Sequence, residues 1–84
     1  MATLAATETI VRAFLERELR LAPDSITRDT ALVTTALLDS ADLVRLAAAL
    51  ERELDMRIPD RDITAEHFDS IARICAYVAS RGAT

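Results

Sequence analysis

Residues 40–54, SADLVRLAAALEREL, carry the clearest secondary-structure signal in the chain. Their apolar side chains recur at intervals of three and four residues, the spacing that places them on one face of a helix. The members of this stripe are Leu43, Leu46, Ala47, Leu50 and Leu54. Consecutive alanines at 47–49 add high helix propensity. Charged residues occupy the opposite face, so the segment predicts one helix of a small helical core.

The sequence before this segment predicts a first helix over about residues 4–20. Its apolar residues follow the i, i+4 spacing of an amphipathic helix. Thr7 is the expected N-cap, with Glu8 well placed at the positive end of the helix dipole. Pro23 disfavours helical backbone at the residue before it, so we expect this helix to end ahead of that proline.

Residues 22–39 have no sustained period and predict a loop between the first two helices. A loop of this length is unusual in a compact domain, and is usually either functional or packed by its own side chains. We expect Ile26, Leu32 and Leu37 to anchor the loop to the core.

The remaining sequence predicts a connector and two further helices. The connector covers residues 56–63, where Ile58 and Ile63 are the expected anchors. A short helix over 65–68 and a last helix over 71–81 follow. The expected caps are Thr64 before the short helix, Asp69 or Ser70 before the last one, and Gly82 after it. With one glycine and two prolines there are few turn formers for strands, so we predict an all-α fold in a single domain over residues 1–84.

The composition argues against several classes of function. Fourteen acidic residues face ten basic ones, all arginine, for a formal net charge of −4. Such a balance lacks the electrostatic footprint of a nucleic-acid binder and suits a protein that meets positively charged partner surfaces. No stretch approaches the ~20 apolar residues of a membrane span, and the first ten residues lack the features of a signal peptide. We therefore expect a cytoplasmic protein that binds neither nucleic acid nor membrane.

Side chains that could carry catalysis or hold a metal are few. Cys75 is the only cysteine, which excludes an internal disulfide, and its apolar neighbours predict a buried thiol. His67 is the only histidine and has no second ligand at a metal-binding spacing. A glycine-rich phosphate loop is absent, and so small a core leaves little room for a desolvated pair of carboxylates. We expect neither an enzyme nor a metal site.

The stretch LLDSAD at residues 37–42 places Ser40 at the mouth of the helix predicted for residues 40–54. Asp39 could cap that helix with Ser40 as its first residue, or Ser40 could itself be the cap. A helix N-terminus also presents free amides and a positive dipole end, which accommodate phosphate. Ser40 is therefore either a structural residue or the attachment point of a phosphodiester.

The chain resembles the acyl carrier protein family, which includes the peptidyl and aminoacyl carrier proteins. The resemblance runs through the Asp39–Ser40 pair, the Leu and Ala stripe after it, and the I-P-D sequence at 58–60. Residues 64–78 are similar to the short third helix and last helix of that family, so the whole chain is covered. The resemblance implies a four-helix bundle with a long loop between helices one and two. It also implies that Ser40 receives 4′-phosphopantetheine from coenzyme A, with Asp39 as the motif aspartate.

What the resemblance implies for function is a free-standing carrier that makes no bonds itself. The arm would hold an acyl or aminoacyl group as a thioester. The implied partners are a phosphopantetheinyl transferase, a loading ligase and downstream acyltransferase or synthase enzymes. They would dock on the helix over 40–54 in brief encounters steered by charge. The expected contact residues are Asp42, Val44, Arg45, Ala48, Glu51 and Arg52. We expect the carrier to be a monomer.

Several positions depart from the family pattern. Ala41 follows the serine where Leu or Met is usual, and Ala36 stands where a glycine often precedes the motif. Arg45 and Arg52 occupy positions that are often acidic in fatty-acid carriers. This mixed charge favours a specialised biosynthetic pathway over housekeeping fatty-acid synthesis. The alternative is an unmodified helical interaction module in which Ser40 only caps a helix.

Overall fold

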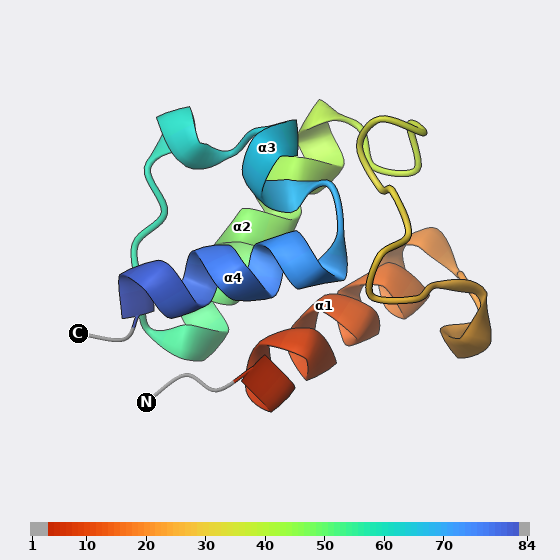
Figure 1. Cartoon of the computed structure of the whole chain (residues 1–84), viewed down its shortest axis with the longest axis horizontal. Helices are drawn as coiled ribbons and strands as arrows, with labels where there is room; N and C mark the ends of the chain where they lie inside the picture. Colours follow the sequence, from red (N-terminus) through yellow and green to blue (C-terminus); the bar gives the residue numbers. More distant parts are fainter. Residues whose placement is uncertain (1–3, 83–84) are drawn as a thin grey trace.

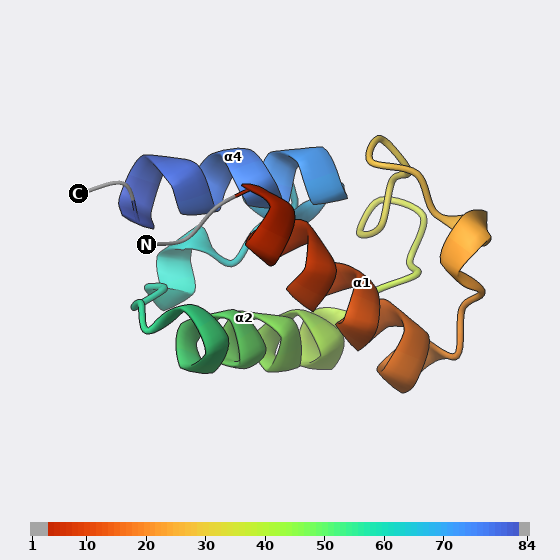
Figure 2. The ribbon, with the colours of Figure 1, turned by 90° about the horizontal axis from the view of Figure 1, so that it is seen from below.

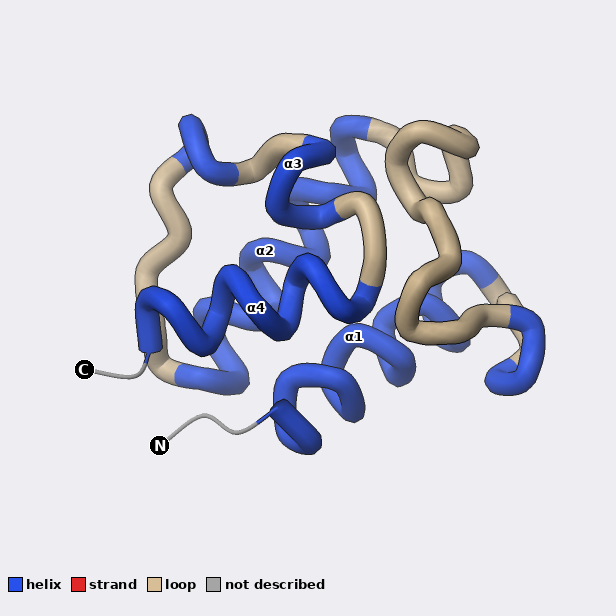
Figure 3. The backbone as a smooth tube through the Cα atoms, in the orientation of Figure 1, coloured by secondary structure: helices blue, strands red, loops and turns tan. Residues whose placement is uncertain are grey.

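The computed structural model describes residues 4–82, and within that range its regular structure is entirely helical (Figure 1). The elements in chain order are α1 (Leu4–Leu19), η1 (Pro23–Ser25), α2 (Ser40–Leu54), η2 (Asp60–Asp62), α3 (Ala65–Phe68) and α4 (Ile71–Gly82), where η marks a 3-10 helix. The predicted all-α fold is confirmed, with its long loop before α2 and its short third helix (Figure 3). The predicted ends of the four α-helices lie within one residue of the observed ends.

Helix α1 crosses between α2 and α4 and packs against both of them, while α3 packs on α4 (Figure 2). The side chains between the helices form a largely aliphatic core. Its fully buried members include Val11, Leu15, Leu32, Leu46, Leu50, Phe68, Ile71 and Ile74. Removing one such large side chain from water contributes roughly 1.5–3 kcal/mol. Because isolated helices this short are marginal in water, the packing between them is what holds them.

The first helix begins ahead of its expected cap. Thr7 lies inside α1 and is only 1% exposed, so the prediction that it caps the helix is wrong. Residues 4–6 include no helix breaker, and the helix therefore extends over them. The Glu8 carboxylate accepts hydrogen bonds from Arg12 Nε at 2.9 Å and from Arg28 Nη1 at 2.6 Å. Glu8 thus links α1 to the loop that follows instead of complementing the helix dipole.

The caps of the last two helices are only partly as expected. Ser70 caps α4, because its hydroxyl oxygen accepts a hydrogen bond from the Arg73 N–H at 3.1 Å. Asp69, the alternative cap, is instead bonded to the loop before α2. Thr64 stands at the N-cap position of α3, but its side chain makes no capping hydrogen bond. Gly82 is the last residue of α4 and has no positive φ, so it is not the left-handed cap predicted there.

The loop before α2 is packed by its own apolar side chains. Ile26 and Leu32 are buried as predicted, but Leu37 is 37% exposed, so its prediction as an anchor is wrong. Leu38 takes that place and is only 2% exposed. Ala36 has a left-handed φ of 63°, which turns the chain so that the second of the two leucines faces the core.

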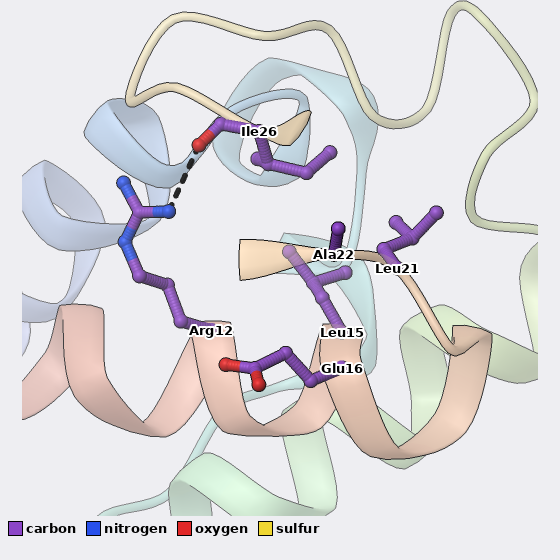
Figure 4. Close-up of a pocket in the computed structure, with 6 residues that line it drawn as sticks. All are labelled: Arg12, Leu15, Glu16, Leu21, Ala22 and Ile26. Atoms are coloured by element: carbon purple, nitrogen blue, oxygen red, sulfur yellow. Dashed lines mark hydrogen bonds between the residues drawn. The ribbon is translucent and has the colours of Figure 1, made fainter. Parts of the chain in front are cut away.

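A polar contact holds the start of this loop against α1. Arg12 reaches across from α1, and its Nη1 donates a hydrogen bond to the Ile26 carbonyl oxygen at 2.9 Å (Figure 4). Beside this bond, Leu15 and Leu21 help to line a cavity of about 10 Å³. That volume is close to the minimum for one water molecule, so the cavity is a packing feature and not a ligand site.

Candidate functional site

Ser40 is the first residue of α2, but it is not the residue that caps the helix. The Asp39 carboxylate accepts a hydrogen bond from the Asp42 N–H at 2.8 Å, and the Asp42 carboxylate accepts one from the Asp39 N–H at 3.3 Å. This reciprocal capping box satisfies the helix start without the serine. Ser40 is exposed, and its hydroxyl makes no hydrogen bond to any residue that the structure describes. The two readings left open by the sequence therefore resolve in favour of Asp39 as the cap.

The start of α2 also suits a phosphodiester. Of its first four amides, that of Asp42 bonds to the Asp39 side chain and that of Leu43 to the Asp39 carbonyl at 3.0 Å. Those of Ser40 and Ala41 have no acceptor among residues 4–82. A phosphate on the Ser40 oxygen would lie beside these two donors, at the positive end of the helix dipole. The residues present therefore fit a phosphate-linked group on Ser40.

Two large apolar side chains flank Ser40 on the surface. Leu37 is 37% exposed and precedes the serine, while Val44 is 58% exposed and follows it by one helical turn. They are the large hydrophobic residues that the described part of the chain leaves exposed. A partner surface that reaches Ser40 can bury both of them. The sequence signal that could have identified Leu37 is the adjacent Leu37–Leu38 pair, because only one of the two can face inward at a tight turn.

A shallow open groove of about 540 Å³ begins one turn beyond Ser40. Its walls come from α2 and from the connector over residues 56–63, which runs back along the helix. The side chains that define it are Val44, Ala48 and Glu51 on one side and Ile58, Pro59 and Ile63 on the other. Ile58 is buried and Ile63 partly buried against the core, as predicted for both anchors. The groove is therefore mixed in character, with apolar side chains on both walls and the charged groups of Glu51, Arg57 and Asp60 beside them.

Glu51 holds the connector against α2. Its carboxylate accepts a hydrogen bond from the Ile58 N–H at 2.8 Å, and its carbonyl oxygen accepts one from the Asp55 N–H at the left-handed cap of the helix. Glu51 is accordingly half-buried. Glu51, which the sequence predicts as a partner-contact residue, therefore also has a structural role, because the chain reverses at Asp55 and brings the connector over it.

The far end of the connector is fixed by α4. Tyr77 donates a hydrogen bond from its hydroxyl to the Asp62 carboxylate at 2.7 Å. Arg81 Nη1 lies 3.6 Å from the same carboxylate oxygen. Burial, and then this hydrogen bond to Asp62, raise the pKa of Tyr77 to about 12. Tyr77 therefore stays protonated and keeps η2, the outer wall of the groove, in place.

The expected contact residues of α2 divide between two sides of the helix. Val44, Ala48 and Glu51 line the groove, as described above. Arg45 lies towards α1, with its Nη1 3.7 Å from Glu18 and 3.6 Å from Asp42. Arg52 is also on that side, where it lines a second open groove between α1 and α2. Both arginine side chains are more than half exposed, so these ion pairs are weak surface pairs.

Other candidate chemistry is sparse in the described part of the chain. Cys75 is buried as predicted, and burial is the main cause that raises the pKa of its thiol. The His67 ring packs against Tyr77 with centroids 4.7 Å apart. Residues 4–82 include no group of His, Cys, Asp or Glu side chains that could hold a metal ion. None of their helices has the length and apolar character needed to cross a membrane.

Comparison with known proteins is consistent with this geometry. The model of the family described as "Phosphopantetheine attachment site" matches residues 9–78. The acyl carrier protein of Clostridium perfringens is 34% identical over 68 residues, which is 81% of this chain and 87% of that protein. The acyl carrier protein of Bdellovibrio bacteriovorus is 29% identical over 72 residues, 86% of this chain and 90% of its own length. The mitochondrial acyl carrier protein of Saccharomyces cerevisiae is 34% identical over 71 residues, 84% of this chain and 55% of that protein.

Family membership defines the general chemistry of the chain. Proteins of this family are carriers and not catalysts, and they are served by a phosphopantetheinyl transferase and by enzymes that handle acyl groups. The match covers most of the chain and includes the whole of α2. The chain therefore belongs to the acyl carrier protein family, as a non-catalytic carrier whose cofactor is covalently attached 4′-phosphopantetheine.

Proposed function

We propose that Ser40 carries the 4′-phosphopantetheine group and that the chain presents an acyl or aminoacyl group to enzymes of a specialised biosynthetic pathway. The observation that carries this assignment is which serine hydroxyls are exposed and which already make hydrogen bonds within the chain. Those of Ser25 and Ser80 donate to backbone carbonyls at 2.7 Å. Ser70 is buried and caps α4. Among the described residues, Ser40 alone of the four serines is exposed with no internal hydrogen bond.

The residues around Ser40 support this role without reacting themselves. When bound, the group supplies a thiol on a flexible arm, which holds the cargo as a thioester at high effective concentration beside a docked enzyme. Asp39 and Asp42 fix the first turn of α2 through their reciprocal hydrogen bonds, so the attachment point is on a rigid element. The two amides left open at this helix start would stabilise the phosphate.

The docking surface that we propose is the exposed face of α2 with the groove beside it. The groove side offers apolar contact through Val44 and Ala48 next to the attachment point. The other side offers the charges of Asp42, Arg45 and Arg52. Weak, charge-steered contact suits a carrier that visits several enzymes in turn. Glu51 can also contribute at the rim, although its carboxylate already bonds to the connector.

The exposed arginines are the reason to propose a specialised pathway. Arg45 and Arg52 have side chains 61% and 68% exposed, which interrupts the acidic surface of α2. An enzyme with matching acidic groups would bind this surface well. An enzyme adapted to a uniformly acidic carrier would place positive charge opposite these arginines, which is costly.

The attachment site is tested by intact mass spectrometry. The chain is incubated with coenzyme A and a broad-specificity phosphopantetheinyl transferase, and Ser40→Ala is compared with the matched exposed serine variant Ser25→Ala. We expect one adduct on the wild type and on Ser25→Ala, and none on Ser40→Ala. Because Asp39 and not Ser40 caps α2, Ser40→Ala should change the free energy of unfolding by less than ~0.5 kcal/mol. An adduct on the folded Ser40→Ala variant would refute the assignment, and a wild type without any adduct would favour an unmodified interaction module.

A further inference from the structure

Four hydrogen-bond donors from the loop before α2 converge on one distant residue, Asp69. Its carboxylate Oδ1 accepts the N–H groups of Val33 at 2.8 Å and of Thr34 at 2.9 Å. The Thr34 hydroxyl donates to the same carboxylate at 3.2–3.3 Å. The Asp69 carbonyl oxygen accepts the Leu32 N–H at 2.7 Å. Asp69 therefore binds three consecutive residues of the loop from its place between α3 and α4.

This set of bonds is not required by the helix that Asp69 precedes. Ser70 already caps α4 through the Arg73 N–H, so the Asp69 side chain is left to serve the loop alone. The backbone bonds from Thr34 and Val33 hold the pKa of Asp69 below its ordinary value. The carboxylate is consequently charged at neutral pH, and hydrogen bonds to a charged acceptor are the stronger kind.

The residues that Asp69 holds form a closed turn that leads into the attachment site. We call residues 32–38 the attachment turn. The Ala36 N–H donates to the Val33 carbonyl and the Leu38 N–H donates to the Leu32 carbonyl, each at 2.9 Å. One end of the attachment turn is thus fixed by Asp69, and the other end is the buried Leu38, which directly precedes the capping Asp39. Figures 1 and 3 show this part of the loop beside the junction of α3 and α4.

We propose that Asp69 is a positioning residue for the modification of Ser40. It holds the attachment turn in one conformation, so that the surface next to Ser40, including the exposed Leu37, is presented to the transferase ready for docking. This inference rests on the proposed attachment at Ser40. If the turn opens, only the fraction of molecules with the turn closed can dock, and the apparent affinity falls by that fraction.

The test measures KM and kcat of the transferase for three variants of the carrier. Asp69→Ala removes the acceptor, and Asp69→Asn keeps one side-chain oxygen but removes the charge. Glu66→Ala is the matched control, because it removes an exposed acid of α3 whose side chain makes no hydrogen bond within residues 4–82. For Asp69→Ala we expect KM for the carrier to rise about tenfold with kcat unchanged, as for a turn that is closed in one molecule of ten. Asp69→Asn should lie between this and the wild type, and Glu66→Ala should match the wild type.

Amide hydrogen exchange separates positioning from general loss of stability. In Asp69→Ala, the Leu38 amide should exchange faster, while amides in the middle of α1 and α4 keep their protection. An unchanged KM in a folded Asp69 variant would overturn the inference, as would a raised KM with loss of protection throughout the chain. If Asp69→Ala does not fold, Asp69→Asn carries the same test. Failure of the wild type to accept the arm would refute the attachment at Ser40 instead, so the two proposals fail in different ways.

Discussion

Helix α2 and the loop before it are adjacent in the chain but are held by different forces. The helix is held by burial of the apolar stripe of its own residues against the core. The loop buries a few apolar side chains of its own and is also held by polar bonds to distant residues, from Arg12 and Glu8 on α1 to Asp69 before α4. Local pattern therefore specifies the helix that bears Ser40, whereas residues distant in the chain specify the shape of the surface beside it.

The largest effect is expected where α2 depends on burial. Leu50→Ala should lower the free energy of unfolding by about 2–5 kcal/mol, because Leu50 is fully buried and its loss leaves a cavity. Val44→Ala is the control, since Val44 is exposed and its truncation should cost no more than ~0.5 kcal/mol. Urea denaturation followed by circular dichroism gives both values. Equal losses for the two variants would mean that the faces of α2 are assigned wrongly.

A smaller loss of stability is expected for Glu51, the residue of α2 whose side chain accepts a hydrogen bond from the connector. Glu51→Ala leaves the Ile58 N–H of the connector without its acceptor, and an unsatisfied backbone donor costs about 1–3 kcal/mol. The matched variant is Glu53→Ala, whose side chain is exposed and should change stability by less than ~0.5 kcal/mol. Chemical denaturation of the two variants under one set of conditions decides the matter. If Glu51→Ala is as stable as Glu53→Ala, the hydrogen bond between Glu51 and the connector does not contribute to the free energy of unfolding.

The loop itself offers a change that should increase stability. Ala36 has a left-handed φ of 63°, a conformation that costs an L-residue roughly 1–2 kcal/mol and glycine very little. The greater freedom of glycine in the unfolded chain offsets part of this gain. Ala36→Gly should therefore stabilise the chain by about 0.5–1 kcal/mol, read as a higher thermal midpoint.

The control variant should change the thermal midpoint in the opposite direction. Ala48→Gly places glycine in the exposed interior of α2 and should destabilise by about 1 kcal/mol. A lower midpoint for Ala36→Gly would show that the attachment turn does not need the left-handed residue.

The contacts with the smallest individual effect on stability are those of the two exposed arginines of α2. Arg45→Glu with Arg52→Glu replaces exposed ion pairs with like-charge contacts to the same acidic partners, each worth about 0.2–0.5 kcal/mol on a helix surface. Under the proposed function, this variant should be loaded more slowly by its own ligase and used faster by general fatty-acid enzymes. Both differences in rate should shrink as salt is raised, because surface charges are screened. Rates that do not change at low salt with either class of enzyme would leave the arginines as ordinary surface residues.

The sequence predicts best where the determinants are local. The predicted start of α2 agrees with the structure because Asp39 and Asp42, which lie within one turn of each other, cap the helix there. Thr7 does not form the predicted cap, because the leucine and two alanines before it also favour helix and nothing local marks the true start. The two leucines at 37 and 38 are equally apolar, and only the left-handed turn at Ala36 decides which of them is buried.

The surface around Ser40 could be predicted less well. Ser40 and Asp39 follow from the motif, but the structural role of Glu51 depends on the reversal at Asp55, which brings the connector over the helix. Asp69 bonds to residues more than thirty positions earlier in the chain. No short-range pattern records such a contact, so it is visible only once the helices are packed.

The unbonded hydroxyl of Ser40 has a thermodynamic consequence. Adding a group to an oxygen that makes no hydrogen bond to the described residues breaks no bond within them. Since the folding equilibrium is altered only by interactions that differ between the folded and unfolded states, attachment should change it only through the contact of the phosphate with the two open amides of α2, worth about 0.3–1 kcal/mol. The modified chain should therefore melt slightly higher than the unmodified one. Partner enzymes can then distinguish a loaded arm from an empty one by contacting the arm or the cargo directly, because the phosphate makes the same contacts with α2 in both.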